Sequence, residues 1–569
     1  ARACRDAGLV FIGPSPEAIL AMGHKAGAKD LMMKAGVPCI PGFQSENTQD
    51  QAEDVLQREA KSVGYPLMIK AVAGGGGRGM RLVLKPEEFI SALRSAKSEA
   101  SGAFGDDTVL LERAILDPRH IEIQIFADRH GHAIHLGERD CSVQRRHQKL
   151  VEEAPSPAVS PELRAQMGAT AVKAALAIGY EGAGTLEFLL DAQGNYFFME
   201  MNTRLQVEHT VTEAITGLDL VELQLRVASG EPLGITQDQV QISGHAIEVR
   251  LCAEDADAGF MPQSGHMRLW QMPDEIRVDH ALESGMDVPP YYDSMIAKLI
   301  AHGRTRDDAL RQLAAALDRS VTLGVTTNRA FLARCLRHPV FAQGSATTGF
   351  IAAHSTDLLA RDAEQDRLAL AIAALLMQAT RATAQTPGRL CLRHPASLRI
   401  ELLEKTSAVL LQSGAAGNCT ASIAGADIKL RLLGLEAGLA SIDVEGIGES
   451  VVWSSTNDVL DFQFRGIGYR AQDRSLTAES SAVAGSDGKV RASMNGRIVA
   501  VHANVGDRLE RGQAIFTLEA MKMEHTHTAP IAGVLKLLNA GLDDQVSAAR
   551  IIAEIEVEMP AVSNLEKTS

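Results

Sequence analysis

The chain has 569 residues, with 46% hydrophobic and 22% charged residues, and its length predicts three or more domains of ordinary globular composition. Lys and Arg number 56 against 71 Asp and Glu, so the net charge of −15 argues against a nucleic-acid partner. Seven scattered cysteines without a C-x-x-C pair argue against a disulfide framework or a zinc site, and they favour a reducing compartment. The most apolar helical run, residues 368–377, is too short to span a bilayer, and no signal-peptide pattern is visible, so we expect no membrane partner.

The start of the chain is expected to hold a strand followed by helices. Residues 9–12 (Leu-Val-Phe-Ile) are apolar and end at Gly13, which predicts a buried parallel strand that stops at a turn. Residues 15–36 read as helical segments, with Pro16 near a helix start, and Lys25 lies among them. Parallel sheets are covered on both faces, and one strand cannot satisfy its own backbone hydrogen bonds, so this strand needs neighbours.

Residues 42–114 read as a compact α/β unit. An apolar strand delivers Lys70 to a glycine-rich loop, residues 74–79, and a second strand follows. Glycine runs also form plain flexible loops. Here the run joins two β-rich segments, so its backbone N–H groups can close over phosphates while Lys70 adds a point charge. No G-K-[ST] sequence follows, so the loop is not a P-loop.

Residues 115–357 are expected to form a larger α/β domain. The segment 120–126 alternates apolar and polar residues as a strand should. The charge-rich stretch 138–155 reads either as a solvated loop or as an anion site. Its basic cluster consists of Arg145, Arg146, His147 and Lys149.

The most specific enzyme signal is a pair of strands that each place a carboxylate inside an apolar run. The strands join at a turn, residues 191–194, and carry Glu187 and Glu200. Buried carboxylates are costly unless they are paired or bind a metal. Alternation places Asn202 on the same strand face as Glu200, so with Glu187 opposite three oxygen ligands can hold Mg²⁺. A polar block, residues 203–209, follows directly.

The last third of the chain is predicted to be mostly β. After an alanine-rich helix come short alternating strands, for example residues 398–402 and 428–432. Residues 474–489 are rich in Ser, Ala, Gly and charge and read as a linker. Beyond them, positions 496–519 repeat at a constant offset of 37 residues, which places two strand–turn–strand copies around Lys522. Two similar halves bury their apolar faces against each other, so we expect a small β-sandwich with Lys522 at a hairpin tip.

Lys522 can be read in two ways. Most lysines are solvated, and an ordinary turn lysine is the plain interpretation. Its position between the two copies of the repeat favours a functional role instead. The motif Glu519-Ala-Met-Lys-Met-Glu524 resembles the biotin attachment motif of biotin carboxyl carrier domains. Lipoyl carrier domains share the fold but usually place Asp-Lys-Ala at the tip. A flexible lysine stem suits a tethered cofactor.

The rest of the chain resembles the α subunit of biotin-dependent acyl-CoA carboxylases. The glycine loop resembles the lid of ATP-grasp enzymes, and the blocks 138–155, 187–208, 245–250 and 289–298 resemble biotin carboxylase. Residues 358–472 resemble the helix-plus-barrel module that docks to a carboxyltransferase. The resemblance therefore implies a multidomain α/β and all-β protein with an ATP-grasp biotin carboxylase region, a helix-plus-β-barrel middle region and a C-terminal β-sandwich biotinyl domain.

This resemblance implies the roles of individual residues. The ATP-binding set is Lys25, Lys70, Gly76, Gly77, Glu112, His120, Gln144, His147, Glu187 and Glu200. The ligands of Mg²⁺ or Mn²⁺ are Glu187, Glu200 and Asn202. Bicarbonate is bound by Lys149, Arg204, Gln206 and Val207. The catalytic residues are Arg204, Glu208 and Arg250, with Glu208 as the base on bicarbonate and Arg250 stabilising an enolate-like biotin oxygen. Biotin is attached to Lys522.

The implied function is ATP-dependent carboxylation of the chain's own biotin with bicarbonate, through carboxyphosphate, in an acyl-CoA carboxylase of the methylcrotonoyl- or geranoyl-CoA type. The implied partners are a separate carboxyltransferase β subunit and a biotin protein ligase, in the cytoplasm or, in a eukaryote, the mitochondrial matrix. Acetyl- or propionyl-CoA carboxylase remains an alternative. Two others are an ATP-grasp ligase with a lipoyl-type carrier, which the Met-Lys-Met sequence disfavours, and a non-catalytic scaffold, which the intact oxygen ligands disfavour.

The resemblance also implies domain bounds. Residues 1–41 would be a remnant of the N-terminal carboxylase domain with its connector, because the resemblance begins partway through that domain, and we expect the chain to be a fragment. The remaining expected bounds are 42–114 for the lid, 115–357 for the ATP-grasp and C-terminal carboxylase domain, 358–473 for the docking helix and barrel, 474–489 for the linker, 490–558 for the carrier domain and 559–569 for a tail.

Overall fold

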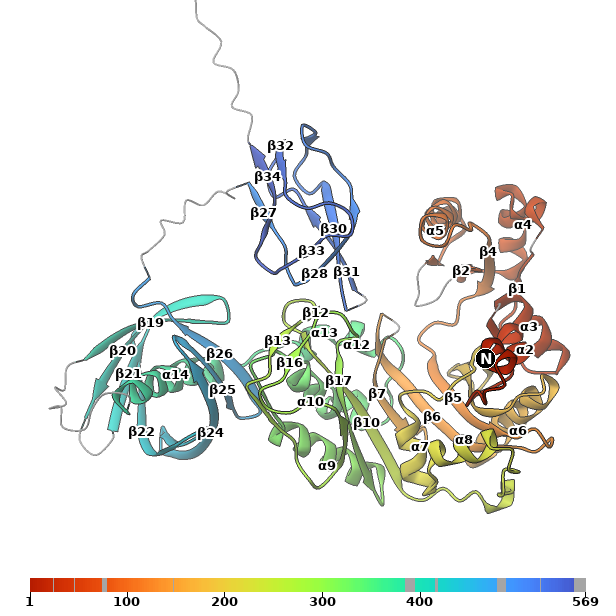
Figure 1. The fold of residues 1–569 in the computed structure, drawn as a ribbon, viewed down its shortest axis with the longest axis horizontal. Helices are drawn as coiled ribbons and strands as arrows, with labels where there is room; N and C mark the ends of the chain where they lie inside the picture. The colour runs from red at the N-terminus through yellow and green to blue at the C-terminus, as the bar shows by residue number, and fades with distance from the viewer. Residues whose placement is uncertain are drawn as a thin grey trace, which may run out of the picture.

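The computed structural model describes residues 1–23, 25–45, 47–73, 79–146, 148–383, 395–414, 418–477, 488–521 and 523–556. Four bodies follow one another along the chain (Figure 1): a small lid sheet, an eight-stranded sheet with helices, a β-barrel and a β-sandwich. This arrangement confirms the predicted fold class. No helix in the described part of the chain combines the length and apolar character that a membrane crossing requires.

The first residues differ from the prediction. Helices α1 (Arg2–Asp6), α2 (Pro16–Gly23) and α3 (Lys25–Lys34) are present, but the strand predicted at residues 9–12 is absent. Leu9 and Val10 are 65% and 68% exposed. None of the described strands runs beside this segment, so its backbone has no ladder to join, and the prediction of a buried strand here is wrong. Helices α2 and α3 instead pack their apolar side chains against the large sheet.

The lid is a four-stranded antiparallel sheet in the order β1 (Gly42–Phe43), β4 (Val109–Arg113), β2 (Leu67–Ala71) and β3 (Met80–Val83). Helices α4 (Glu53–Val63) and α5 (Phe89–Phe104) bury Leu56 and Phe89 against it. Two 3₁₀ turns, Thr48–Gln51 and Pro86–Glu88, complete the unit. The glycine loop predicted to cover phosphates, with Gly76 and Gly77, lies outside the described residues, and Lys70 stands on β2 just before it.

The large sheet is antiparallel throughout and carries the site residues. Its strands, in spatial order, are β15 (Arg277–His280), β17 (Met295–Gly303), β10 (His245–Cys252), β7 (Gln148–Ala154), β6 (Ala133–Arg145), β5 (Arg119–Ala127), β8 (Gly182–Leu190) and β9 (Tyr196–Asn202). The central strands are buried on both faces, because helices pack on them. These helices are α6 (Pro161–Ala177), α7 (His209–Thr216), α8 (Leu220–Ala228), α9 (Arg306–Arg319) and α10 (Arg329–Arg337).

Short elements surround the C-terminal half of this sheet. The strands are β11 (Glu254–Asp255), β12 (Met261–Pro262), β13 (Gly265–His266), β14 (Leu269–Gln271), β16 (Asp287–Val288) and β18 (Val321–Leu323). The helical turns are η3 (Gln237–Gln239), α11 (Pro339–Ala342), α12 (Phe350–Ala353) and α13 (Ser355–Leu358).

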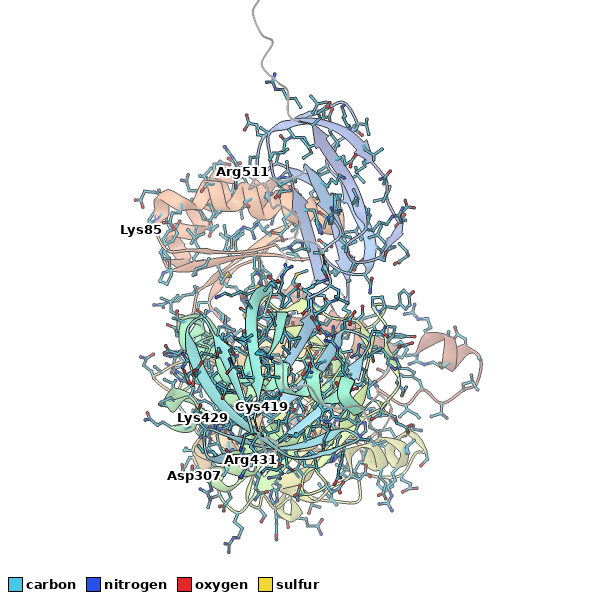
Figure 2. The ribbon with its side chains drawn as sticks, turned by 90° about the vertical axis from the view of Figure 1, so that its left-hand side faces the viewer. Lys85, Asp307, Cys419, Lys429, Arg431 and Arg511 are labelled. Carbon is cyan, nitrogen blue, oxygen red and sulfur yellow. The ribbon has the colours of Figure 1, made fainter. Side chains whose placement is uncertain are left out.

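The middle region is a closed antiparallel barrel packed around one helix. Helix α14 (Ala363–Thr383) buries all of residues 368–377 in one core with the inward side chains of the strands. Because the helix is apolar all round, it needs partners on every side, and a closed barrel supplies them. Figure 2, at right angles to Figure 1, shows the barrel in front, with Lys429 and Arg431 labelled on it. The barrel strands are β19 (Ala396–Leu402), β20 (Lys405–Ser413), β21 (Asn418–Ile423), β22 (Ala426–Glu436), β23 (Leu439–Val444), β24 (Ile447–Thr456), β25 (Val459–Phe464) and β26 (Ile467–Asp473).

The carrier domain confirms the predicted sandwich of two similar halves. One sheet has the order β27 (Lys489–Arg491), β34 (Ile551–Glu556), β32 (Gly533–Leu538) and β29 (Arg508–Leu509). The other has the order β31 (Met523–Thr528), β30 (Ala514–Ala520), β28 (Gly496–Val501) and β33 (Gln545–Val546). The two glycines related by the 37-residue repeat are packed in the same way. A Cβ atom at Gly496 would collide with the carbonyl oxygen of Glu519, and a Cβ atom at Gly533 would collide with the carbonyl oxygen of Glu556. The turn between β30 and β31 holds position 522, which lies outside the described residues.

We predict that Leu376→Ala lowers the free energy of unfolding of the helix-and-barrel region by about 2–5 kcal/mol, because it leaves a cavity where the side chain is fully buried. Leu433→Ala, at a side chain that is 53% exposed on β22, should change it by less than about 0.5 kcal/mol. Chemical denaturation of both variants measures the difference. Equal losses would contradict the helix-filled barrel.

Candidate active site

The ammonium group of Lys149 lies at the centre of a cluster of buried carboxylates. Its Nζ is 2.6 Å from Glu122 Oε2, 2.9 Å from Glu187 Oε1 and 2.6 Å from Glu208 Oε1. Burial alone would lower the pKa of Lys149, but the neighbouring anions raise it well above its usual value. The lysine therefore stays charged and offsets the charge of three side chains that would otherwise be costly to bury.

Strand register explains why these side chains meet. On neighbouring strands Glu122 of β5 is opposite Arg139 of β6 and Glu187 of β8, and Glu187 is opposite Glu200 of β9. Side chains directly opposite in antiparallel strands share one face and lie close together. The sheet thus presents a row of charges across four strands. Lys149, from β7, reaches over this row.

The inner end of the row is fixed by Arg139, which is fully buried. Its Nε is 2.5 Å from Glu122 Oε1, and its terminal nitrogens donate to Gln124 Oε1 at 2.7 Å and to Gln206 Oε1 at 3.0 Å. Burial raises the pKa of Glu122, but Arg139 and Lys149 outweigh it and bring that pKa down to about 2. Glu122 is therefore a permanent anion that positions both cations.

The outer end of the row is where the sequence predicted a magnesium site. Asn202 Nδ2 donates to Glu187 Oε1 at 2.9 Å, and the exposed Glu200 stands opposite Glu187 in the register. His120 Nε2 lies 3.0 Å from Glu187 Oε2. Burial raises the pKa of Glu187, but His120 and Lys149 bring it well below the usual range, so the carboxylate is ionised. Two neighbouring carboxylates and an amide oxygen fit the oxygen ligands that Mg²⁺ prefers.

Glu208 is held between two cations. It is the residue before α7, it is 2% exposed, and its Oε2 accepts a hydrogen bond from Arg250 Nη2 at 3.0 Å. Arg250 also donates from Nε to Glu152 Oε1 at 2.5 Å. Lys298 Nζ fixes the adjacent backbone by donating to Val207 O at 2.7 Å.

The structure separates Arg204 from this group. Arg204 is exposed, and its Nη1 and Nη2 donate to Leu205 O at 3.4 Å and Asn202 Oδ1 at 3.3 Å. Gln206, in contrast, is buried in the row, where its Nε2 donates to Glu187 Oε1 at 2.9 Å. Arg204 is therefore beside the predicted metal ligands, on the open side of the site.

The lid contributes a second charged cluster. Glu112 of β4 accepts from Lys70 Nζ at 2.6 Å and from Lys29 Nζ at 2.7 Å. Burial raises the pKa of Glu112, but Lys70 and Lys29 outweigh it, so its pKa falls below the usual value. Of the other predicted ATP contacts, Lys25 is the first residue of α3 and Gln144 lies opposite Lys149 on β6. His147 lies outside the described residues.

Sequence reasoning missed several members of the site: Lys29, Glu122, Arg139, Glu152, Glu248 and Lys298. For Glu122, Arg139 and Glu152 the available signal was a charged residue at a buried position of a strand. For Lys29 the signal was its place four residues after Lys25, on the same helix face.

The carrier domain touches the carboxylase region at the hairpin end next to position 522. The backbone N–H of Met521 donates to Pro290 O at 3.3 Å, and Asn495 Nδ2 donates to Ser264 Oγ at 2.8 Å. The Met521 side chain is buried in the carboxylase core, while Met261 packs against the carrier core. Figure 1 shows the carrier domain lying over β12 and β13 with this end pointing down.

Family models match three parts of the chain. Residues 24–236 match the ATP-binding domain of the carbamoyl-phosphate synthase L chain, residues 248–353 the biotin carboxylase C-terminal domain, and residues 488–555 the biotin-requiring enzyme domain. The biotin carboxylase domain of Hydrogenobacter thermophilus 2-oxoglutarate carboxylase, solved with MgADP and bicarbonate, is 44% identical at a TM-score of 0.60 and covers 64% of this chain and 80% of that one. With the charged row, these matches define an ATP-grasp biotin carboxylase that carries a biotinyl domain, a ligase that uses ATP, Mg²⁺ and covalent biotin.

Relatives extend over nearly the whole chain. The mitochondrial methylcrotonoyl-CoA carboxylase subunit alpha of Dictyostelium discoideum is 42% identical over 97% of this chain and 82% of its own length. The Nostoc biotin carboxylase is 52% identical over 62% of this chain and 78% of its own length. The chain belongs to the family of methylcrotonoyl-CoA carboxylase alpha subunits, and it carries out the ATP-dependent carboxylation of biotin.

We predict a pH-dependent stability that depends on Glu248. This residue is fully buried on β10, opposite Glu152 of β7, and burial together with Glu152 raises its pKa from 4.5 to about 8. The raised pKa favours the neutral acid in the folded state. Its stabilisation is present below the unfolded pKa and is lost as pH rises through about 8. The melting temperature should therefore fall less between about pH 6 and pH 8 in Glu248→Gln than in the parent, because the amide does not titrate.

The matched control is Glu283→Gln, at an exposed carboxylate, which should follow the parent at every pH. Parallel melting curves for parent and Glu248→Gln across this pH range would show that Glu248 does not hold a proton in the folded protein.

Proposed function

We propose that Glu208 is the general base that removes the proton from bicarbonate. The observation that carries this role is the position of its buried carboxylate between Lys149 Nζ at 2.6 Å and Arg250 Nη2 at 3.0 Å. An anionic substrate needs cations beside the base, and these two supply them. A buried carboxylate held by fixed donors keeps one geometry, which general base catalysis requires.

Bicarbonate is assigned in this proposal to the space in front of Lys149, Arg204, Gln206 and Val207. Gln206 and Val207 immediately precede Glu208, and their positions are fixed by Arg139 and Lys298. Arg204 approaches from the exposed side, where it can neutralise substrate charge. Arg250 has the second proposed catalytic role, the stabilisation of negative charge on the ureido oxygen of biotin. Its guanidinium donates to Glu208, the residue that borders the proposed bicarbonate site.

ATP is assigned to the space between the lid cluster and the charged row, and its proposed contacts are Lys25, Lys70, Gly76, Gly77, Glu112, His120, Gln144, His147, Glu187 and Glu200. Glu187, Glu200 and Asn202 are the proposed ligands of Mg²⁺, which supplies charge neutralisation of the nucleotide phosphates when bound. The support is the register that brings Glu187 opposite Glu200, with Asn202 hydrogen-bonded to Glu187.

Lys522 is the proposed site of biotin attachment. The biotin-requiring enzyme domain matches residues 488–555, and the turn that holds position 522 joins β30 to β31 at the centre of the 37-residue repeat. The contact of Met521 with Pro290 supports transfer within one chain, because it brings the neighbouring residue to the carboxylase region. We also propose the domain bounds that the sequence predicts, from the remnant at residues 1–41 to the carrier domain at 490–558 and the tail at 559–569.

We also propose the acyl-CoA acceptor, the partner proteins and the compartment in which the chain works. Relatives named methylcrotonoyl-CoA carboxylase subunit alpha cover nearly the whole chain, which supports methylcrotonoyl-CoA as the final acceptor and a β subunit that holds the carboxyltransferase. A biotin protein ligase is needed to load Lys522. Every cysteine among the described residues is free, which supports a reducing compartment, the cytoplasm or the mitochondrial matrix.

Glu208→Gln should lower bicarbonate-dependent ATP hydrolysis with free biotin by about 10²–10⁴-fold, because the amide keeps the shape but cannot accept the proton. The matched control is Glu222→Gln, at an exposed side chain on α8, which should retain the parent rate. A Glu208→Gln protein with parental melting behaviour and a rate within a few-fold of the parent would remove Glu208 from the role.

Lys522→Arg should abolish biotinylation, since arginine cannot form the amide that links biotin to a lysine amine. Co-expression with a biotin ligase followed by intact mass measurement should show one biotin on the parent and on Lys536→Arg, an exposed lysine of the same domain, and none on Lys522→Arg. Biotin that persists on Lys522→Arg would place the attachment at another residue, while a lipoyl group on the parent would identify a different carrier.

A further inference from the structure

A cavity of about 110 Å³ lies between the carboxylase region and the barrel, and none of its lining residues belongs to the charged row. On the carboxylase side it is lined by β11, β18 and the start of α10, and on the barrel side by β25 and β26. Two interactions cross this junction beside the cavity. Arg268 forms an ion pair with Asp461 at 2.7 Å, and Arg470 Nη2 donates to Gly324 O at 2.8 Å. The cavity is therefore part of the contact between two regions of the chain.

One wall of the cavity is Arg329, whose charge is unusually poorly compensated. The residue is 3% exposed, its Nη1 donates to Leu317 O at 2.7 Å, and its Nε is buried without a hydrogen-bond partner. Among the described residues, no carboxylate forms an ion pair with it. Arg139, the other deeply buried arginine considered above, has carboxylate, amide and hydroxyl partners on all its nitrogens.

Burial accordingly lowers the pKa of Arg329 to about 10, and Asp318 offsets this only in part. An arginine at that pKa is still charged at neutral pH. A buried charge without a counter-ion is costly, so this position gains most from an anion that enters the cavity.

A second guanidinium strengthens the case. Arg334, five residues further along α10, also lines the cavity. Its Nη1 donates to Ala360 O at 3.4 Å, but its Nε is likewise buried without a hydrogen-bond partner. Arg361 and Arg470 line it too, but they are already paired, with Asp257 at 2.6 Å and Asp461 at 2.7 Å. The cations left to bind a ligand are therefore the two on α10.

The start of α10 adds backbone donors, and three carboxylates of the lining oppose an anion. Asn328 precedes the helix and its side chain makes no capping hydrogen bond, and the first residues of the helix, Arg329, Ala330 and Phe331, line the cavity. Such helix ends favour anions. Asp257 pairs with Arg361, and Asp461 pairs with Arg268 and Arg470. The third carboxylate is Asp255, whose Oδ1 accepts from the backbone N–H groups of Asp257 and Ala258.

We propose that this cavity binds one small oxyanion of the inorganic phosphate class, held by Arg329, Arg334 and the first turn of α10. A cavity of about 110 Å³ has room for a tetrahedral oxyanion. The bound anion compensates the two guanidinium groups and stabilises the junction between the carboxylase region and the barrel.

The experiment measures binding of inorganic phosphate to the full chain by calorimetry, with the active site saturated by a non-hydrolysable MgATP analogue and bicarbonate, and compares the parent with Arg329→Met and Arg334→Met. Each variant should weaken phosphate binding about tenfold or more, because it removes a charge-assisted hydrogen bond. The control is Arg311→Met, an exposed arginine on α9 that does not line the cavity and pairs with Asp308, and it should bind phosphate as the parent does.

A second readout separates a binding role from a purely structural one. In chloride buffer without phosphate, Arg329→Met should be at least as thermostable as the parent, because it removes a buried uncompensated charge, while the stabilisation that phosphate gives the parent should be lost. A parent that binds no phosphate beyond the active site, or variants that bind it unchanged, would overturn the proposal. If Arg329→Met does not fold, the half-buried Arg334 carries the same test.

Discussion

The carboxylase half depends on the ion pairs that Lys149 forms with three buried carboxylates. Glu122, Glu187 and Glu208 come from separate segments of the chain, and each is almost completely buried. Three carboxylates so close together would repel one another and favour protonation, and one ammonium group at 2.6–2.9 Å from all three removes both problems. The same ion pairs align strands β5, β7 and β8, so the charge that serves catalysis also fixes the sheet.

Whether a residue of this site could be predicted from the sequence depends on how the fold brings it there. Glu187, Glu200 and Asn202 lie on two strands joined by a short turn, so their meeting follows from local alternation and was correctly foreseen. Glu122 and Arg139 depend on the register between strands that neither local pattern nor composition determines, and they were missed. The same limit explains residues 9–12, whose apolar run fits a strand but has no neighbour among the described strands to pair with.

The carrier domain was predictable for a different reason. Its 37-residue repeat is a long-range pattern that can be seen in the sequence itself. The repeat predicts the two similar sheets and the turn between β30 and β31. Its contact with the carboxylase region was not predictable, because Met521 and Asn495 meet Pro290 and Ser264, partners that are more than 200 residues away in the sequence. Each of these hydrogen bonds joins neutral groups and gives a modest net stabilisation, to which the buried side chain of Met521 adds apolar contact.

The barrel closed around α14 has a consequence for how the chain is made. The helix precedes all eight strands in the sequence, and the ring closes only when β26, the last strand, pairs with β19, the first. Until that pairing forms, the apolar surface of residues 368–377 lacks its full enclosure, and the pairing joins segments about 70 residues apart, which makes it slow. During synthesis on the ribosome this helix therefore emerges long before its container is complete. Over that interval its apolar side chains lie open to water and can associate with other chains.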